Sequence, residues 1–331
     1  MYLLAFGWQL FKLESFTLKS GIYHIPLKLP WNSPGYVNVY LIEDNDGLVM
    51  IDCGVNGKEF LQLLESEVNK LNFNFGDIKL LIGTHMHSDH IGLSSSLREL
   101  DIPFALYKNS ENFIDVYNDW SIRFKELHDY AKKEGAPKSF LENLSEIKTP
   151  SHSGVVKTPD ILLEEGPVKF LNRKINTIFT PGHDITEISL FDESSKIIFS
   201  GDHILPRITP FIPTINQEED LLTKYIESLD KVYNIEHDLI APGHFELIEE
   251  PHKRIEQMKL HHQRRSEKIL NILKGKNING WDIMLELFPR ELDELNQRLA
   301  FQETMSHLKY LENKNLLFHD TSSSKSTWKL I

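Results

Sequence analysis

The chain has 331 residues, of which 40% are hydrophobic and 25% are charged, so it is long enough for one large domain with a buried site and a smaller second domain. Its net charge of −12 disfavours non-specific attraction to nucleic acid and to anionic lipid. The single cysteine, Cys53, excludes an internal disulfide framework and a cysteine-rich zinc site, and it favours a cytoplasmic protein.

The apolar start of the chain is too short to cross a membrane. Residues 1–8 are mostly apolar, but Gln9, Lys12 and Glu14 follow within two turns, and no basic residue precedes the run. A membrane span needs about 20 apolar residues in a row, and a secretory signal needs a basic start. We therefore expect no membrane segment here.

The first 250 residues are predicted to alternate between short buried strands and helices. Apolar runs at 37–42 and 48–51, separated by a polar turn with Gly47, indicate a β-hairpin. Phe60, Leu64 and Val68 recur at helical spacing in a predicted helix over 60–71. A buried strand is expected at 78–82 and a helix at 91–100. Further strands are expected at 175–179, 188–191, 197–200 and 239–241, with a helix at 218–233.

Residues 108–151 depart from this alternation. Phe113, Tyr117, Trp120 and Phe124 recur at helical spacing, and a second amphipathic stretch covers 138–147. We interpret the segment as a helical insertion into the domain formed by residues 1–250.

The chain from residue 251 onward is predicted to form a separate helical domain. It carries 14 Lys and Arg against 10 Asp and Glu, whereas residues 1–250 are strongly acidic. Amphipathic helices are expected at 254–273, 281–287 and 299–312, followed by strands at 316–318 and 327–330. Three helices and a two-stranded ribbon are the composition of a small winged-helix unit. We expect this domain, 251–331, to serve packing or homodimerisation rather than contact with nucleic acid.

Residues of metal-ligand type directly follow five of the predicted strands. They are Asp52, the run His85-Met86-His87-Ser88-Asp89-His90, His183, Asp202 and His244. Side chains at strand ends can converge on one edge of a sheet, where rigid strands hold them in place. A glycine precedes each of His183, Asp202 and His244 and allows a tight turn. The sequence therefore predicts one polar cluster at a sheet edge.

This cluster offers too many ligands for one tetrahedral ion. The candidates are His85, His87, Asp89, His90, His183, Asp202 and His244. Imidazole and carboxylate suit Zn²⁺, and also iron or manganese. Two ions that share the Asp202 carboxylate would use all seven residues and hold a bridging water that is deprotonated near neutral pH. We therefore predict two divalent ions, Zn²⁺ first, with iron or manganese as alternatives.

The order and spacing of these residues resemble the metallo-β-lactamase fold superfamily over residues 20–250. The resemblance implies an α/β fold, a four-layer αββα sandwich with the site at one edge of its two sheets. It also implies the ligand sets: His85, His87 and His183 for the first ion, Asp89, His90 and His244 for the second, and Asp202 for both. Asp52 matches an early aspartate of the family that orients a ligand. A second His or Ser, which many relatives carry near the His183 position, is missing from 180–184.

The resemblance extends more loosely to the C-terminal domain. His262-x-x-Arg265 and the later stretch 303–311 resemble the small helical domain appended to some of these hydrolases. We interpret the basic face at 261–265 as a solvated helix face rather than an anion-binding patch.

We expect the enzyme to cleave an ester, thioester or lactone bond of a small molecule with the bridging hydroxide, as glyoxalase II-type thioesterases and lactonases do. Asp89 is a candidate to steer the hydroxide and accept a proton, and Asp52 to support the site. The insertion at 108–151 is a candidate lid with an aromatic pocket, or its aromatic residues only pack it on the body. The alternative function is a binuclear phosphodiesterase or ribonuclease whose C-terminal domain contacts nucleic acid; the acidic body argues against it.

Overall fold

Two β-sheets form the centre of the computed structural model, which describes residues 14–214, 216 and 218–331; the apolar start at 1–8 lies outside them. The larger sheet contains, in order across it, β1 (Phe16–Lys19), β2 (Ile22–Lys28), β3 (Tyr36–Asp44), β4 (Gly47–Ile51), β5 (Ile78–Ile82), β6 (Phe104–Tyr107) and β7 (Ile161–Leu163). The smaller sheet contains β12 (Leu239–Pro242), β11 (Ile197–Gly201), β10 (Ile188–Asp192), β9 (Ile175–Phe179) and β8 (Gly166–Pro167).

The central strands are mostly apolar because both of their faces are buried. In β3, Tyr40 and Ile42 point into the core between the two sheets. The alternate residues Val37, Val39 and Leu41 point to the opposite side, into the core beneath the outer helices. This period of two places these five side chains alternately in the two hydrophobic layers.

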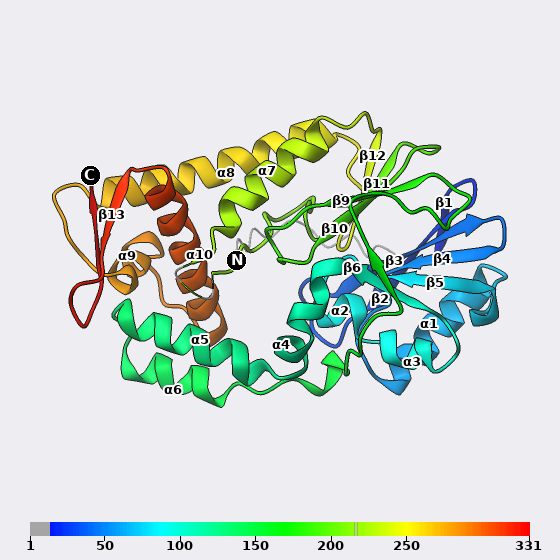
Figure 1. Cartoon of the computed structure of the whole chain (residues 1–331), viewed down its shortest axis with the longest axis horizontal. Coiled ribbons are helices and arrows are strands. Elements are labelled where there is room, and N and C mark those ends of the chain that lie inside the picture. Colours follow the sequence, from blue (N-terminus) through cyan, green and yellow to red (C-terminus); the bar gives the residue numbers. More distant parts are fainter. Residues whose placement is uncertain (1–13, 215, 217) are drawn as a thin grey trace.

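Helices cover the outer face of each sheet. On the larger sheet lie α1 (Lys58–Lys70), α2 (Ser88–Ile91) and α3 (Ser94–Arg98), and on the smaller sheet lie α7 (Leu221–Tyr233) and α8 (Pro251–Ile272). Leu64 and Val68 of α1 are fully buried, as predicted from their spacing. The four-layer αββα sandwich is therefore confirmed, and Figure 1 shows it in the right half of the molecule.

The predicted strands and helices match these elements closely, with one correction. The single helix expected over 91–100 is wrong, because the chain forms two short helices separated at Gly92 and Leu93. A Cβ on Gly92 would lie 2.4 Å from the backbone N of Asn56. The chain thus approaches a neighbouring loop too closely for a side chain at this point.

The insertion and the C-terminal segment are helical, as predicted. The insertion contains α4 (Ile114–Asn118), α5 (Trp120–Lys133) and α6 (Lys138–Glu146); the C-terminal segment adds α9 (Gly280–Leu287), α10 (Glu294–Asn313), β13 (Leu317–Asp320) and β14 (Thr327–Leu330) to α8. Short 3₁₀ helices occur at Phe75–Asp77, Lys108–Phe113 and Ser151–Ser153. The three helices and the ribbon expected of a winged-helix unit are present; the winged-helix assignment and dimerisation stay predictions.

The insertion shares a hydrophobic core with the C-terminal helices. Phe124 of α5 and Phe140 of α6 lie in one buried cluster with Trp281 of α9 and Phe301 of α10. Figure 1 shows α5 and α6 below α9 and α10, away from the sandwich, with the long α8 bridging the two parts along the top. Tyr117 instead packs in the core of the larger sheet. Tyr117 thus packs the insertion on the body, as the second interpretation expects, whereas Phe124 packs it on the C-terminal helices. No helix in the described part of the chain is long and apolar enough to span a membrane.

A buried carboxylate joins the insertion to the end of the chain. Glu134, just after α5, is fully buried and accepts four hydrogen bonds. The donors are the backbone N of Gly280 (3.1 Å), Trp328 Nε1 (2.9 Å), Ser326 Oγ (2.6 Å) and His319 Nε2 (2.9 Å). Because a buried carboxylate is stable only when its oxygens are satisfied, these contacts fix α5 against the C-terminal ribbon.

Replacing Glu134 with alanine should therefore destabilise the whole protein. The change leaves buried donors on Trp328 and Gly280 unsatisfied, and we expect a loss of about 3 kcal/mol or more in the free energy of unfolding. Urea unfolding of Glu134→Ala measures the loss, and Glu126→Ala on the exposed face of α5 is the matched control. Equal stability of the two variants would contradict the role of Glu134.

Two buried histidines join α8 to α10. His262 Nδ1 lies 3.2 Å from His307 Nε2, and His307 Nδ1 donates to the backbone oxygen of Glu303 (2.8 Å). Burial lowers the pKa of His307 to about 4, although the Glu303 carboxylate opposes the shift. The folded protein therefore holds His307 neutral at pH values where a free imidazole takes up a proton.

Acidification should weaken the fold through His307. The unfolded chain binds a proton near the ordinary pKa of 6.5, which the folded state excludes until about 4, so stability falls as the pH drops through this window. We expect His307 to account for a loss of about 2 kcal/mol between about pH 7.5 and about pH 5. Urea unfolding at both pH values should show a smaller loss for His307→Gln than for the wild type. An identical loss in the two proteins would refute this, and His128→Gln serves as the control.

Candidate metal centre

The polar residues that follow the strands meet at one edge of the two sheets. Backbone hydrogen bonds between their turns hold this edge together: Gly243 N donates to Gly201 O (2.6 Å), and Asn38 N donates to Gly243 O (2.7 Å). Across the two sheets, Ile188 N donates to Thr84 O (2.9 Å). The turns are thus fixed relative to one another before any side chain is considered.

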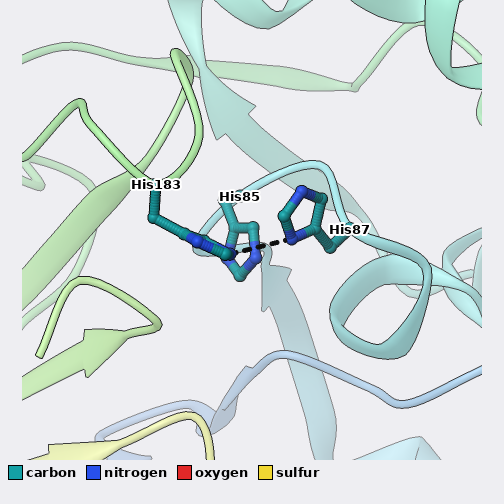
Figure 2. Close-up of side chains that lie close together, drawn as sticks. All are labelled: His85, His87 and His183. Atoms are coloured by element: carbon teal, nitrogen blue, oxygen red, sulfur yellow. Dashed lines mark hydrogen bonds between the residues drawn. The ribbon is translucent and has the colours of Figure 1, made fainter. Parts of the chain in front are cut away.

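Three histidines form the first group. His183 Nε2 lies 3.0 Å from His87 Nδ1, and the ring centroids of His85 and His87 are 4.5 Å apart. One nitrogen from each of His85, His87 and His183 lies within 4.8 Å of the others. Figure 2 shows the three rings pointing toward one another from two different turns of the chain.

Asp89, His90 and His244 form the second group, with ligand atoms within the same 4.8 Å. His244 Nε2 lies 3.3 Å from Asp89 Oδ2. Asp202 stands between the two groups, because its Oδ2 lies 3.6 Å from His183 Nε2 and 3.4 Å from His244 Nε2. Its Oδ1 lies 3.5 Å from His90 Nε2. The structure therefore brings all seven predicted ligand residues together.

Outside the two groups, hydrogen bonds fix how the imidazole rings are turned. The Nδ1 atoms of four rings bond outward: His85 to Thr84 Oγ1 (3.0 Å), His90 to Asp52 Oδ2 (2.7 Å), His183 to Phe211 O (2.7 Å) and His244 to Tyr36 O (2.7 Å). Their Nε2 atoms consequently face inward. His87 is turned the other way and presents Nδ1. Such outer bonds are the usual means by which a protein orients metal-binding histidines.

The inward-facing atoms fit a divalent cation. His85 Nε2, His90 Nε2 and Asp202 Oδ1 are buried and have no hydrogen-bond partner within the described ranges. Buried polar atoms are rarely left unsatisfied, and imidazole nitrogens with carboxylate oxygens are the donor set of zinc, iron and manganese sites. The first group and the second group could each hold one ion, with Asp202 reaching both.

The electrostatics of the two groups differ. Burial and the nearby histidines lower the pKa of His85 well below its ordinary value. At His244 burial acts in the same direction, but the carboxylates of Asp202 and Asp89 outweigh it and raise the pKa to about 10. The surroundings of His244 thus favour positive charge, which a divalent ion can supply in place of the proton.

Asp52 supports the site from behind. Its backbone is left-handed, with a φ of 59°, which is uncommon for a residue with a side chain. In this conformation its carboxylate accepts hydrogen bonds from Thr84 N (2.8 Å), Thr84 Oγ1 (2.9 Å) and His90 Nδ1 (2.7 Å). Asp52 therefore connects the turn after β4 to the histidine motif, and it does not face the inward-pointing ligand atoms.

Two glycines at the site let neighbouring side chains approach the backbone closely, in addition to allowing tight turns. A Cβ on Gly243 would lie 2.6 Å from Asp202 Oδ1, and a Cβ on Gly201, whose φ is 52°, would lie 2.7 Å from Thr84 Oγ1. Any larger residue at either position would displace the atoms that define the site.

Sequence reasoning missed a carboxyl group beneath the site. Glu187 is fully buried, and its Oε1 accepts a hydrogen bond from Asp202 N (2.9 Å) and lies 3.8 Å from His85 Nδ1. Burial and the charge of Asp202 raise the pKa of Glu187 well above its ordinary value, which favours the neutral form. A charged residue directly before the buried strand β10 was the available signal.

Comparison with known proteins agrees with this geometry. The profile of the Metallo-beta-lactamase superfamily matches residues 32–244. The chain is 26% identical to the probable metallo-hydrolase YqjP of Bacillus subtilis, over 84% of this chain and 88% of that protein. It is 30% identical to the beta-lactamase-like protein 2 homolog of Drosophila melanogaster, over 85% of this chain and 83% of that protein. A further relative, an atrochrysone carboxyl ACP thioesterase of Aspergillus fumigatus, is 23% identical over 72% of this chain and 60% of its own length.

A solved structure shows the same fold. The beta-lactamase domain protein from Burkholderia ambifaria superimposes with a TM-score of 0.83 at 22% identity, and the match covers 96% of this chain and 94% of that chain. The match spans the C-terminal helices as well as the sandwich. Together, the fold, the His and Asp clusters and these relatives establish that the chain is a metallo-hydrolase that belongs to the metallo-beta-lactamase superfamily.

Proposed function

We propose that the chain hydrolyses an ester, thioester or lactone bond of a small molecule at a centre of two divalent ions. In this proposal His85, His87 and His183 hold the first ion, Asp89, His90 and His244 the second, and Asp202 both. The position of the Asp202 carboxylate carries the proposal, because one oxygen lies 3.6 Å from the first group at His183 and 3.4 Å from the second at His244. Zn²⁺ is the ion we propose first, with iron or manganese as alternatives.

Two such ions would supply a hydroxide nucleophile at neutral pH and polarise the carbonyl of the substrate. The protein contributes the fixed orientation of the ligands. Asp52 holds His90, and the backbone oxygens of Phe211 and Tyr36 hold His183 and His244, so little reorganisation is needed during the reaction. We propose that the Asp89 carboxylate, 3.3 Å from His244 Nε2, also accepts a proton as the bond breaks.

Two observations support an acyl substrate over a phosphodiester. One relative is named a thioesterase, and that protein is a precedent for acyl-bond hydrolysis by this chain. The net charge of −12 also opposes the approach of a polyanion such as RNA.

A substrate panel tests the proposal directly. We expect the protein to hydrolyse p-nitrophenyl esters, thioesters or lactones, and to lose this activity on incubation with a chelator and regain it when Zn²⁺ is added back. Cleavage of only a phosphodiester, such as bis-p-nitrophenyl phosphate, would contradict the proposal and favour a phosphodiesterase or ribonuclease.

Asp202→Ala should lower kcat/KM by on the order of 1,000-fold, because it removes the group shared by both ions. Asp238→Ala, which removes an exposed carboxylate just before β12, is the control. The two-metal arrangement is wrong if Asp202→Ala keeps full activity and two equivalents of metal by elemental analysis.

Asp52→Asn should weaken metal binding without removing a ligand. The amide cannot accept from His90 and Thr84 as the carboxylate does, so His90 loses its fixed orientation. We expect metal affinity, measured by competition with a chromophoric chelator, to fall by about 10- to 100-fold. Asp46→Asn in the exposed β3–β4 turn should match the wild type. Unchanged affinity in Asp52→Asn would show that Asp52 does not support the site.

A further inference from the structure

A cavity of about 980 Å³ lies between α7, α8 and α10. Figure 1 shows α7 and α8 side by side along the top of the molecule, and α10 contacts both of them. The surface of the cavity is mostly apolar and includes Leu260, Leu270 and Leu316, and two of its charged residues, Asp230 and Lys259, form an ion pair. Among the described residues that line it, none is a metal-ligand candidate. The cavity is therefore separate from the metal centre.

Two buried polar side chains line this cavity and lack a partner. His262 and Ser266 lie one turn apart on α8 and are only 2% and 7% exposed. His262 Nε2 and Ser266 Oγ have no hydrogen-bond partner within the described parts of the chain. Buried polar atoms are normally satisfied, because removing them from water without a partner is costly. These two atoms therefore point to a bound group that the cavity accommodates.

The hydrogen bonds behind His262 determine what its free nitrogen can do. His307 Nδ1 donates to the backbone oxygen of Glu303 (2.8 Å), so the Nε2 of the neutral His307 ring is an acceptor. His262 Nδ1, 3.2 Å from His307 Nε2, is then the donor of that bond. Burial and the neighbouring His307 lower the pKa of His262 well below its ordinary value, so this ring is neutral and has only one proton. His262 Nε2 is therefore an acceptor that needs a donor.

This chemistry narrows the class of ligand. A carboxylate or phosphate does not fit His262 Nε2, because that atom has no proton to donate. A hydroxyl group fits both free atoms, because it donates its proton to one of them and accepts a hydrogen bond from the other. The cavity has room for much more than one water molecule, which occupies about 30 Å³. Its apolar walls favour an apolar body on the ligand.

We propose that the cavity between α7, α8 and α10 binds a small, largely apolar alcohol or phenol. The hydroxyl group of this ligand donates to His262 Nε2 and accepts from Ser266 Oγ, and its apolar body packs on the leucine side chains of the cavity. The site is distinct from the metal centre, and its existence does not depend on the proposed function.

A matched pair of probes tests this inference. 4-Methylphenol and 4-fluorotoluene are nearly equal in size and shape, but only the first has a hydroxyl group. Each is titrated into the metal-loaded full chain, and binding is followed by ligand-observed NMR. We expect 4-methylphenol to bind about tenfold more tightly, because 4-fluorotoluene leaves the acceptor on His262 unsatisfied. Equal affinity for the two probes, or binding of neither, would overturn the inference.

Variants of the two polar residues locate the binding. Ser266→Ala should weaken the binding of 4-methylphenol by about fivefold, since it removes one hydrogen bond, and Ser266→Leu should abolish it by filling the cavity. Ser323→Ala, in the exposed turn before β14, is the matched control and should bind as the wild type does. His262→Phe should bind both probes equally. If His262→Phe does not fold, the serine variants still decide, and unchanged binding in both of them refutes the site.

Asp202→Ala separates this site from the metal centre. This variant should bind 4-methylphenol with wild-type affinity, because Asp202 does not line the cavity. The opposite pattern, in which binding is lost in Asp202→Ala and kept in Ser266→Leu, would place the phenol at the metal centre and overturn the inference. Both results are independent of which substrate the enzyme hydrolyses.

Discussion

The structure depends on a local excess of ligand atoms that face one another in a buried space. Imidazole nitrogens and carboxylate oxygens meet within 4.8 Å at the edge of the two sheets, and several have no hydrogen-bond partner among the described residues. Such an arrangement is unfavourable without a cation, so much of the fold nearby serves to impose it. The strand ends bring the turns together, the glycines allow the approach, and Asp52 accepts a left-handed backbone in order to hold His90.

The sequence was sufficient for most of the sandwich because its strands are buried on both faces. Runs such as 78–82 and 175–179 are mostly apolar and are followed within four residues by a histidine, and the structure has strands over these same residues. β2 and β6 were not predicted, since β2 contains Pro26 and a buried His24, and β6 is only four residues long. The helix expected over 91–100 is interrupted at Gly92 and Leu93, where the chain passes close to Asn56, a tertiary contact that no local pattern reveals.

At the site, too, local sequence patterns were predictable and contacts between distant residues were not. The seven ligand candidates were predictable because each lies in a short segment that follows a strand, and the ends of neighbouring strands can converge on one sheet edge. Glu187 was not identified, because its significance lies in the residue that it contacts. Glu187 directly precedes β10, and only the folded chain brings its carboxyl group to the backbone N of Asp202. The shared core of the insertion and the C-terminal helices was equally invisible, because the two segments are separated by more than 100 residues.

The four hydrogen bonds to Glu134 have a consequence for how this protein can be divided or recombined. A cut after residue 250 looks natural from the sequence, yet it would strip α5 and α6 of the aromatic layer they pack against and leave a buried carboxylate without donors. The insertion and the C-terminal segment therefore form one structural module that is encoded by two separate parts of the chain. In chimeras between relatives, swapping either piece alone should yield an insoluble product, whereas swapping both together transplants a complete unit onto a new sandwich.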